Sequence, residues 1–430
     1  MKSAIYLGML GLGTVGTGVA KVLAANAHNI EQKVGAPVVL KKILVRDLKK
    51  PRAVAVEAKL TDDIEAILGD KDIKVVVEVM GGESPAKDYI IRALKAGKHV
   101  VTANKDVVAK YGRELFAAAE ENNVDLLFEA SVGGGIPIIR PLKQCLAGNK
   151  ISEVMGIVNG TTNYMLTKMT NEKMDYKTVL AEAQQKGFAE ADPTADVGGW
   201  DAARKIAILA SIAFGTRVTL DDVAVEGITG ITTEDIEYAG ELGYVIKLLA
   251  IARDTEKGAD VRVHPAFIAR SHPLAAVQDV FNAIFVKGDA VGETMFYGRG
   301  AGEMPTASAV VADIIDVARD IKHNVSSRIL CTCFESKPIC PPTLPESPYY
   351  IRLLVEDKPG VLAAIAGAFG AQQVSLNSVI QKRKVDNRAE IVLITYHVSH
   401  ANMQLALNTL AGMSVVTKVS SVIRVIDDAK

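Results

Sequence analysis

The sequence predicts an α/β chain that begins with a doubly wound parallel sheet, continues into a mixed-sheet α+β domain and ends in a small ferredoxin-like domain. Three observations predict this order. An apolar run at residues 4–10 leads through closely spaced glycines into a helix-favouring segment. Apolar β-branched runs then alternate with helical segments as far as residue 128. A proline-rich stretch at 336–348 separates the last strand-like and helix-like segments from the rest.

The glycines after the first apolar run follow a Gly-x-Gly-x-x-Gly pattern, with Gly11, Gly13 and Gly16. The first glycine allows a sharp turn, the second lets the backbone approach a pyrophosphate, and the third lets the helix pack closely on the strand. The unpaired N–H groups and the dipole at the helix start then hold the phosphates. We therefore expect a Rossmann-type dinucleotide-binding domain. A signal peptide is disfavoured, because the glycines interrupt the apolar run and no small-residue cleavage site follows.

Length and composition narrow the class of protein. The chain has 430 residues, too many for a single core, so two or three domains are expected. Its formal net charge is −1, which gives no electrostatic reason to expect a nucleic acid or an anionic membrane as partner. The 4 cysteines form no Cys-x-x-Cys pair, which favours a reducing, cytoplasmic compartment. The longest apolar runs, such as 206–214, are too short to cross a bilayer.

The second predicted strand, 38–45, ends in Arg46 and Asp47. An acid at this strand end would bind the adenosine ribose of NAD, whereas an arginine favours the 2′-phosphate of NADP. Both are present with Arg46 first, so NADP is favoured over NAD. The alternative is that both are solvated loop charges.

Three further strands are predicted at residues 73–80, 99–102 and 126–128, and the resulting strand–helix–strand series fits a six-stranded doubly wound sheet. A helix at 85–96 lies between the first two of these. Lys105 follows the strand at 99–102, and strand ends of this kind line the ligand crevice of such sheets. Lys105 is therefore a candidate cofactor-facing residue, with a plain surface charge as the alternative.

A glycine-rich loop at 129–137 follows the last of these strands and begins with Glu129. Its accessible main-chain carbonyls could close over a ligand, or could surround a monovalent cation together with the Glu129 carboxylate, because hard cations prefer oxygen ligands. The alternative is a flexible connection between domains.

Four acids crowd the next region beside the only tryptophan of the chain, and they are Glu190, Asp192, Asp196 and Asp201. They follow a strand at 151–158, a helix that begins near Thr161 and a second helix at 175–186. This crowding suggests recognition of an ammonium or hydroxyl group. Lys205 stands one helical turn after Asp201, so the two side chains share a helix face. A surface ion pair is the alternative.

The rest of the chain predicts a mixed sheet over 244–286, then glycines at 298–302 that open a helix at 305–321. These glycines suggest another close backbone approach to a ligand, or a plain turn. The helix is expected to return to the first domain and cover its sheet. The prolines of 336–348 predict a stiff, extended linker, and the strand–helix–strand–strand–helix–strand pattern after it is ferredoxin-like.

These motifs together resemble the homoserine dehydrogenases that carry a C-terminal ACT domain. The resemblance covers essentially the whole chain and rests on the order and spacing of GLGTVG at 11–16, TANK at 102–105, EASVGGGIP at 129–137, NGTTNY at 159–164, KGFAEADP at 186–193, the Asp201/Lys205 helix and GRGAG at 298–302. Because Met1 lies just before the first strand, we expect a monofunctional member without the aspartokinase fusion.

The resemblance implies reversible NAD(P)H-dependent reduction of L-aspartate 4-semialdehyde to L-homoserine, a step of threonine, methionine and isoleucine biosynthesis. Lys205 matches the proposed proton donor, and Lys105 is a second candidate for this role. The residues that match substrate contacts are Glu190, Asp201, Gly160 and Thr161. Those that match cofactor contacts are Gly11, Leu12, Gly13, Thr14, Val15, Gly16, Arg46, Ala103, Lys105 and Gly302. A sodium ion matches Glu129, Val132, Gly134 and Ile136, the last three through main-chain oxygen.

The pattern and the resemblance together assign residues 1–136 to nucleotide binding, 137–305 to substrate binding and dimerisation, 306–335 to the returning helix, 336–348 to the linker and 349–430 to the ACT domain. ACT domains pair side by side and bind amino acids, so a homodimer or homotetramer is expected. L-threonine is the expected feedback effector, with Asp357, Gly360 and Asn377 as candidate contacts. The alternative is a dimerisation module without a ligand.

Two other functions compete with this interpretation. Aspartate-semialdehyde dehydrogenase chemistry needs a cysteine nucleophile. The only cysteine in the first 330 residues, Cys145, lies in an apolar, helix-like stretch away from any glycine turn, which disfavours that chemistry. A non-catalytic sensor of NAD(P) and amino acids would not need Glu190, Asp201 and Lys205.

Overall fold

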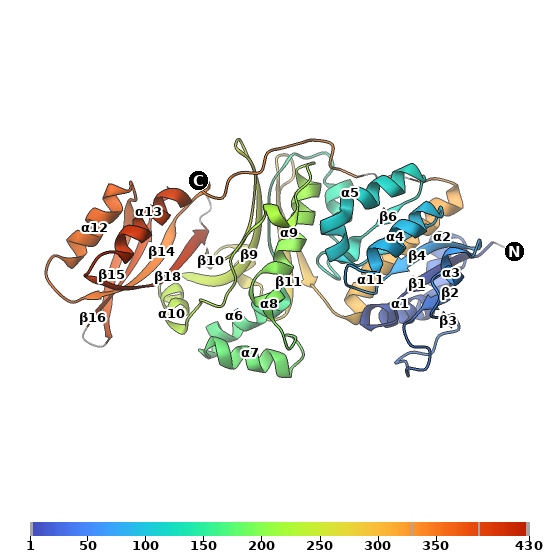
Figure 1. Cartoon of the computed structure of the whole chain (residues 1–430), viewed down its shortest axis with the longest axis horizontal. Coiled ribbons are helices and arrows are strands. Elements are labelled where there is room, and N and C mark those ends of the chain that lie inside the picture. Colours follow the sequence, from blue (N-terminus) through green and yellow to red (C-terminus); the bar gives the residue numbers. More distant parts are fainter. Residues whose placement is uncertain (1–2, 327, 330, 386–387, 427–430) are drawn as a thin grey trace. The chain divides into compact units, whose positions relative to one another are not determined.

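The computed structural model describes residues 3–326, 328–329, 331–385 and 388–426 (Figure 1). These residues form two compact units. The first unit comprises residues 1–154, 204–222 and 282–337, and the second comprises 155–203, 223–281 and 338–430. Each unit is therefore assembled from stretches that are distant in sequence. Strand β7 (Ile151–Ile157) and helix α9 (Trp200–Ala213) are divided between the two.

The first unit contains the predicted parallel sheet, and its six strands lie in the order β3-β2-β1-β4-β5-β6. All of its paired strands run parallel. This is the doubly wound order of dinucleotide-binding domains, so the predicted fold class is confirmed for this part. The strands are β1 (Ile5–Leu10), β2 (Val38–Leu44), β3 (Lys59–Thr61), β4 (Ile73–Glu78), β5 (His99–Thr102) and β6 (Leu126–Leu127).

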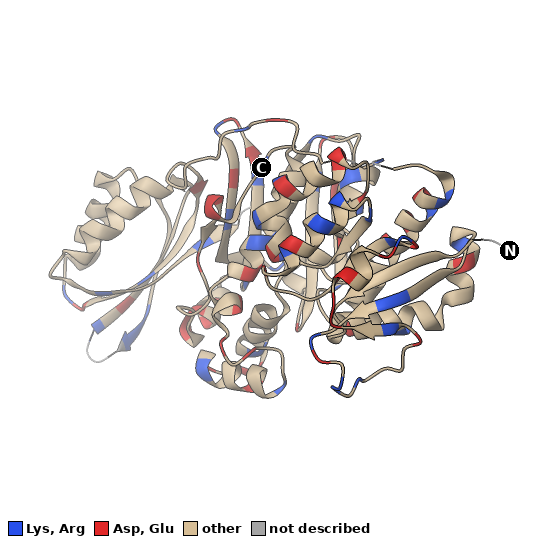
Figure 2. Cartoon of the chain, turned by 45° about the vertical axis from the view of Figure 1, so that its right-hand side comes forward, with Lys and Arg blue, Asp and Glu red and all other residues tan. Residues whose placement is uncertain are grey.

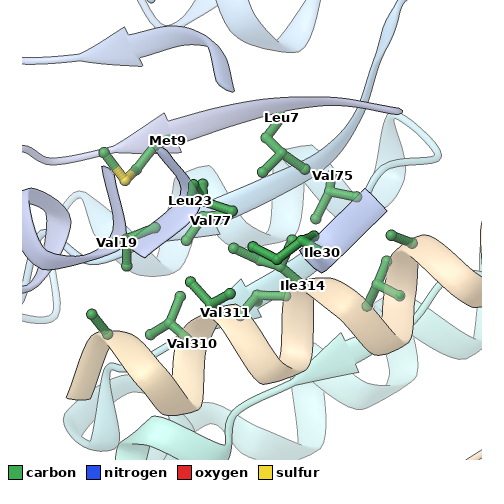
Figure 3. Close-up of a cluster of buried hydrophobic side chains, with 14 of the residues drawn as sticks. Leu7, Met9, Val19, Leu23, Ile30, Val75, Val77, Val310, Val311 and Ile314 are labelled. Carbon is green, nitrogen blue, oxygen red and sulfur yellow. The ribbon is translucent and has the colours of Figure 1, made fainter. Parts of the chain in front are cut away.

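Helices cover both faces of this sheet. One face packs against α1 (Thr14–Ala25), α2 (Ala27–Val34) and α11 (Glu303–His323), and Figure 3 shows the core that they share with the sheet. Val310 and Ile314 of α11 meet Leu7 and Val77 in that core. The other face packs against α3 (Glu65–Leu68), α4 (Ala86–Lys95) and α5 (Lys105–Glu121). Helix α11, which comes late in the sequence, thus packs on this sheet and covers part of one face.

The sequence predicts a loop for the segment between the first helix and the second strand, but this segment is helical. It forms α2, which buries Ile30 and Val34 one turn apart and ends at Gly35 with φ 79°. A left-handed glycine of this kind is a common helix end. The remaining elements of this unit are three short helical turns, Glu129–Ser131, Pro141–Cys145 and Leu220–Asp222, and strands β11 (Phe281–Gly288) and β12 (Gly292–Arg299).

The second unit contains the predicted mixed sheet. Strands β9 (Tyr244–Thr255) and β10 (Gly258–Ala269) form a long antiparallel hairpin, and β10 pairs in parallel with β18 (Val416–Ile426). The other elements before the linker are α6 (Gly160–Glu172), α7 (Tyr176–Gln185), α8 (Thr194–Val197), β8 (Ala224–Val225), α10 (Thr233–Glu241) and the turn Pro273–Ala276.

The ferredoxin-like module is present with the strand order β18-β14-β16-β15. Helices α12 and α13 share a buried core with these strands. Because β18 also pairs with β10, the module continues the sheet of the preceding domain. Its elements are β14 (Tyr349–Glu356), α12 (Val361–Ala371), β15 (Leu376–Val385), β16 (Arg388–Thr395), α13 (His400–Ala411) and β18, and the short strands β13 (Glu346–Ser347) and β17 (Val398–Ser399) pair beside them.

The proline-rich linker lies against β10. The Ala259 N–H donates to the Pro338 carbonyl at 2.9 Å, and the Cys340 N–H donates to the Ala259 carbonyl at 2.9 Å. Cys340 is buried. Residues 338–340 are extended along the strand, but a turn at 342–344, in which the Leu344 N–H donates to the Pro341 carbonyl at 3.0 Å, interrupts the predicted extended linker.

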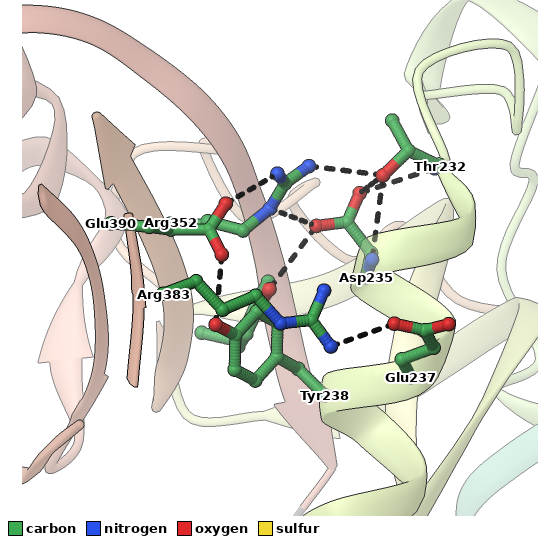
Figure 4. Close-up of polar contacts among 8 residues, drawn as sticks. Thr232, Asp235, Glu237, Tyr238, Arg352, Arg383 and Glu390 are labelled. Atoms are coloured by element: carbon green, nitrogen blue, oxygen red, sulfur yellow. Dashed lines mark hydrogen bonds and ion pairs between the residues drawn. The ribbon is translucent and has the colours of Figure 1, made fainter. Parts of the chain in front are cut away.

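A buried polar network joins the module to α10 (Figure 4). Arg352 of β14 donates to Asp235 at 2.9 Å and to Glu390 at 3.0 Å, and the Tyr238 hydroxyl donates to Glu390 at 2.8 Å. Burial, and then Glu390, raise the pKa of Tyr238 to about 12. These contacts fix α10 to the sheet face opposite α12 and α13.

Charged residues of both signs are interspersed along the chain (Figure 2), in line with the formal net charge of −1. Among the residues that the structure describes, no helix combines the length and the apolar character that a bilayer span requires.

Candidate functional site

The glycine turn of the first unit has the geometry that the sequence predicts. Gly11 has φ 103°, and a Cβ there would lie 2.9 Å from the Val79 carbonyl oxygen. A Cβ on Gly16 would lie 2.4 Å from the Gly11 carbonyl oxygen. Gly13 is the N-cap of α1, no side chain caps that helix, and no atom lies within 4 Å of where its Cβ would be. The turn therefore fits a phosphate cradle, since Gly11 and Gly16 close it and the space at Gly13 is open.

The second glycine turn, at residues 298–302, lies beside the first. It opens α11, whose N-cap is Gly302 with φ 122°. A Cβ on Gly18 of α1 would lie 2.5 Å from the Glu303 carbonyl oxygen, and Glu303 forms an ion pair with Lys21 at 2.7 Å. The close contact of α1 with α11 brings both glycine turns to one end of the sheet.

A buried polar cluster holds the strand ends beside these turns. The Thr102 hydroxyl donates to the Glu78 carboxylate at 2.6 Å, and the Asn104 side chain donates to the Gly82 carbonyl at 2.7 Å. Burial raises the pKa of Glu78. Asn104 caps α5 by accepting the Val107 N–H, so Lys105 is the first residue of that helix. Ala103, in the same stretch, donates its N–H to the Glu78 carbonyl at 3.2 Å.

Arg46 and Asp47 are both exposed after the end of β2. Asp47 is engaged locally, because its carboxylate accepts the Lys49 N–H at 2.8 Å and its carbonyl accepts from Arg52. No such local contact of Arg46 is seen in the described part of the chain. Asp47 therefore stabilises the loop that follows β2.

Glu129 is buried and organises the backbone that follows it. One carboxylate oxygen accepts the N–H groups of Ile138 and Ile139 at 2.6 and 2.8 Å, and the other accepts the Arg140 N–H at 2.7 Å. Each carboxylate oxygen has about two lone pairs, so one acceptor position remains on the second oxygen. Val132 and Ile136, whose carbonyls are candidate cation ligands, are also buried.

The loop after Glu129 packs on the second glycine turn. A Cβ on Gly134 would lie 2.4 Å from the Gly300 carbonyl oxygen, and the Gly135 N–H donates to the Arg299 carbonyl at 3.0 Å. Within the described residues no group of three or more His, Cys, Asp or Glu side chains could hold a metal. A cation at this loop would depend mainly on main-chain oxygen.

Asp313 of α11 completes the surroundings of Glu129. Its carboxylate accepts the Glu129 N–H at 2.9 Å and an Arg140 guanidinium N–H at 2.7 Å. Burial, and then the charge of Glu129, raise the pKa of Asp313 to about 7. The two acids are separated in sequence by almost the whole second domain, and no local sequence pattern indicated that they would lie together.

In the second unit, Asn159 forms hydrogen bonds with two of the four acids singled out from the sequence. Its side-chain amide donates to Asp196 at 2.7 Å and to Asp201 at 2.9 Å. Its amide oxygen accepts the Thr162 N–H at 2.8 Å and so caps α6. Asn159 was not among the predicted site residues. Its position as a capping residue before a helix was a visible signal, but nothing in the sequence pointed from it to the acids.

The loop that carries Glu190 is tied to the same helix start. The Thr161 hydroxyl, next to Gly160, donates to the Phe188 carbonyl at 2.6 Å, and Glu190 itself is exposed. The four acids were expected to recognise an ammonium or hydroxyl group, but Asp192 makes local contacts instead. Its carboxylate accepts the N–H and hydroxyl of Thr194 at 3.1 and 2.6 Å, so it shapes the turn before α8.

Helix α9 carries the other two candidates, Asp201 and Lys205, one turn apart. Within the first unit, the Arg204 Nε lies 2.9 Å from an Asp106 carboxylate oxygen. Arg204 and Asp106 each adjoin a candidate lysine, Lys205 and Lys105. The ion pair therefore brings the two chain segments that carry these lysines together.

The three candidate effector contacts lie on the ferredoxin-like module. Gly360 is the N-cap of α12 with φ 88°, and Asn377 is exposed on β15. Asp357 forms an ion pair with Lys384. Asp357 and Gly360 share the first strand–helix turn, while Asn377 lies on a different strand.

Comparison with known proteins identifies related sequences along most of the chain. Residues 11–129 match the model described as "Homoserine dehydrogenase, NAD binding domain", residues 137–315 match "Homoserine dehydrogenase", and residues 349–412 match "ACT domain". A homoserine dehydrogenase of Bacillus subtilis is 46% identical over 425 residues, with 98% of each chain covered.

Solved structures agree with these matches. A homoserine dehydrogenase from Thiobacillus denitrificans has a TM-score of 0.95 at 42% identity, with 99% of each chain covered. A hyperthermophilic archaeal homoserine dehydrogenase mutant in complex with NADPH has a TM-score of 0.63 at 27% identity, covering 73% of this chain and 98% of that one.

Proposed function

The chain belongs to the homoserine dehydrogenase family and is an oxidoreductase, and from this premise we propose which of its residues carry the reaction. The observation that carries the proposal is the bridge of Asn159 between Asp196 and Asp201. An amide that donates to two carboxylates fixes their positions at the start of α6 and α9. Asp201 then accepts the hydroxyl of L-homoserine, and Glu190 accepts its ammonium group.

Lys205 is proposed as the general acid for aldehyde reduction. A bound nicotinamide supplies the hydride in this reaction. The Lys205 ammonium polarises the aldehyde oxygen and gives it a proton, and the reverse reaction returns that proton to the lysine. Lys105 is the second candidate, and its place at the first turn of α5 suits contact with both cofactor and substrate. Positioned general acids are worth about 10²–10⁴-fold in rate.

The dinucleotide is proposed to lie on the turn Gly11–Gly16, with contacts from Leu12, Thr14, Val15, Ala103 and Gly302. We favour NADP over NAD because Arg46 is exposed beyond β2 while Asp47 is engaged in its own loop. The archaeal relative crystallised with NADPH is consistent with this choice.

A monovalent cation, sodium, is proposed at Glu129 and at the carbonyls of Val132, Gly134 and Ile136. The remaining acceptor position on Glu129 permits one carboxylate contact, and the buried main-chain oxygens suit a hard cation. Such a cation would fix the loop that packs on the second glycine turn, and would thereby act on cofactor placement.

L-threonine is proposed as a feedback effector that binds the ACT domain near Asp357, Gly360 and Asn377. The chain is proposed to form a homodimer or homotetramer, because modules of this kind associate side by side. A cytoplasmic location is proposed because Cys145, Cys331, Cys333 and Cys340 are all free thiols. Titration with threonine in a calorimeter, together with inhibition assays, tests the effector.

Oxidation of L-homoserine with NADP⁺ or NAD⁺, followed at 340 nm, tests the function as a whole. We expect turnover of L-homoserine in the absence of phosphate, a higher kcat/KM with NADP⁺, and no turnover of L-2-aminobutyrate, which lacks the hydroxyl group. Activity with L-aspartate 4-semialdehyde that requires phosphate would instead indicate the phosphorylating dehydrogenase. Dinucleotide binding without any turnover would indicate a sensor.

A further inference from the structure

A pocket in the first unit combines two thiols with two cationic side chains. Cys331 and Cys333 line it together with Lys143 and Arg217, and apolar side chains of α5 and α9 form its wall. The Arg217 guanidinium donates to the Cys331 sulfur at 3.4 Å. The Cys333 sulfur lies 3.9 Å from the Ser211 carbonyl oxygen. Both cysteines are half-buried, so small reagents can reach them.

The backbone that carries the thiols is anchored beside the pocket. The Glu335 N–H donates to the Gly215 carbonyl at 2.9 Å, and the Lys337 N–H donates to the Thr216 hydroxyl at 3.0 Å. These bonds hold residues 331–337 along the segment that follows α9. The cysteines therefore have a fixed position relative to Arg217 rather than lying in an open tail.

The charges in the pocket make the two thiols unequal. A hydrogen bond from Cys333 and the positive charges of Arg217 and Lys143 lower the pKa of Cys331, while the same hydrogen bond and burial raise the pKa of Cys333. Lys143 lies 5.2 Å from the centres of the Phe116 and Phe128 rings, and burial lowers its pKa. A thiolate beside a neutral thiol in a cationic, partly open setting is the arrangement of an oxidant-sensitive pair.

We propose that Cys331 and Cys333 form a peroxide-reactive site that closes to an intrachain disulfide. The Cys331 sulfur attacks hydrogen peroxide, the O–O bond breaks, an S–O bond forms and water leaves after proton uptake, which gives a sulfenic acid. The Cys333 sulfur then displaces the sulfenic oxygen as a second water, and the S–S bond forms. Two thiols lose two electrons and two protons, and one peroxide takes them up. This site is independent of the proposed dehydrogenase function.

Mass analysis of the intact full-length chain tests the proposal. After treatment with hydrogen peroxide and removal of the excess by catalase, the wild type is expected to lose two hydrogens and to protect two thiols from alkylation, and a reductant is expected to restore both. Cys333→Ser is expected to stop at the sulfenic acid and to be trapped by dimedone. Cys331→Ser is expected to react no faster than the exposed Cys145, with Cys145→Ser as the matched control that leaves the reaction intact.

The rate of alkylation against pH gives a readout that needs no variant. We expect Cys331 to react faster than Cys145 at pH 6 and to reach its maximal rate at a lower pH, because the cationic side chains of the pocket favour its thiolate and its lower nucleophilicity offsets only part of that gain. Arg217→Gln is expected to move the midpoint of this profile upward, and Arg217→Lys to restore it partly. A Cys331 profile equal to that of Cys145, or oxidation mapped to Cys145 alone, would overturn the proposal.

Discussion

Arg204 and Asp106 form an ion pair of 2.9 Å between helices α9 and α5 of the first unit. Both side chains are about one-third exposed, so the pair contributes only about 0–1 kcal/mol to stability. Its importance is positional, because the neighbouring residues are Lys205 and Lys105. The pair fixes the two helix segments from which the candidate acid and its alternative extend.

Replacement of Lys205 by alanine is expected to lower kcat for aldehyde reduction by about 10²–10⁴-fold, since the carbonyl oxygen loses its proton donor. The measurement is the initial rate of NADPH consumption with L-aspartate 4-semialdehyde. Lys105→Ala is the comparison, and a smaller loss of kcat with weaker NADPH binding would assign Lys105 to the cofactor. Arg204→Gln serves as the control for helix placement. Near-normal kcat in Lys205→Ala would remove this lysine from the mechanism.

Replacement of Asn159 by aspartate separates its two roles. The new carboxylate can still cap α6 by accepting the Thr162 N–H, but it cannot donate to Asp196 and Asp201. We expect KM for L-homoserine to rise at least tenfold, because three carboxylates would repel one another at the proposed substrate site, while the Kd for NADP⁺ stays within about twofold. Asn159→Ala should in addition lose about 1 kcal/mol of stability with the cap. An unchanged KM in Asn159→Asp would mean that the bridge has no part in substrate binding.

The glycine turn allows a matched pair of variants. Gly13→Ala introduces a methyl group into open space, so the fold should persist while the methyl group occupies the phosphate cradle. Its Kd for NADP⁺, measured by titration calorimetry, is expected to rise more than tenfold with little change in melting temperature. Gly16→Ala meets the Gly11 carbonyl oxygen at 2.4 Å and should destabilise the domain as well. Wild-type affinity in Gly13→Ala would place the dinucleotide elsewhere.

The features that were predicted correctly depend on local sequence patterns, whereas those that were missed depend on contacts between distant parts of the chain. The doubly wound class of the first sheet followed from β-branched runs alternating with helices, and the ferredoxin-like sequence of elements followed in the same way, whereas the short edge strand β3 was not predicted. Helix α2 was missed because Ile30 and Val34 supply too little periodicity without the partners that bury them. The pairing of Arg204 with Asp106 depends on the tertiary fold and has no local signature. Spacing also could not show that Asp192 would bind Thr194 while Asp196 binds Asn159.

Lys247 predicts a pH dependence of stability. Its ammonium group is buried, donates to the Asn163 amide oxygen at 3.0 Å and to the Val277 carbonyl, and burial lowers its pKa from 10.5 to about 8. The unfolded chain therefore binds the proton more tightly than the folded chain between these pH values. The penalty of the buried charge is fully present below about pH 8 and disappears as the pH rises towards 10.5.

The free energy of unfolding of the wild type, measured relative to Lys247→Met, is thus expected to increase with pH by up to about 3 kcal/mol between pH 7 and 10. Urea unfolding of both chains at several pH values measures this difference, and the other lysines cancel in the comparison. A difference that stays constant with pH would show that the folded lysine keeps its ordinary pKa.

Arg352 predicts how firmly the ferredoxin-like module is held on α10. Its guanidinium joins Asp235 and Glu390, both nearly fully buried, and also donates to the Thr232 hydroxyl at 2.9 Å (Figure 4). Arg352→Met leaves two buried acids without their cation, so a loss of about 3–5 kcal/mol in the free energy of unfolding is expected, measured by urea denaturation.

The triple variant Arg352→Met, Asp235→Asn, Glu390→Gln removes the uncompensated charges and is expected to recover most of that loss, because the penalty comes from the charges that remain and not from the absent bonds. The control is the single variant Arg383→Met. Arg383 of β15 forms a partly exposed ion pair with Glu237 of α10, so its loss should lower the free energy of unfolding by less than about 1 kcal/mol. If the triple variant were no more stable than Arg352→Met, packing of the arginine stem would explain the effect, and the network would have no electrostatic role in joining the module to α10.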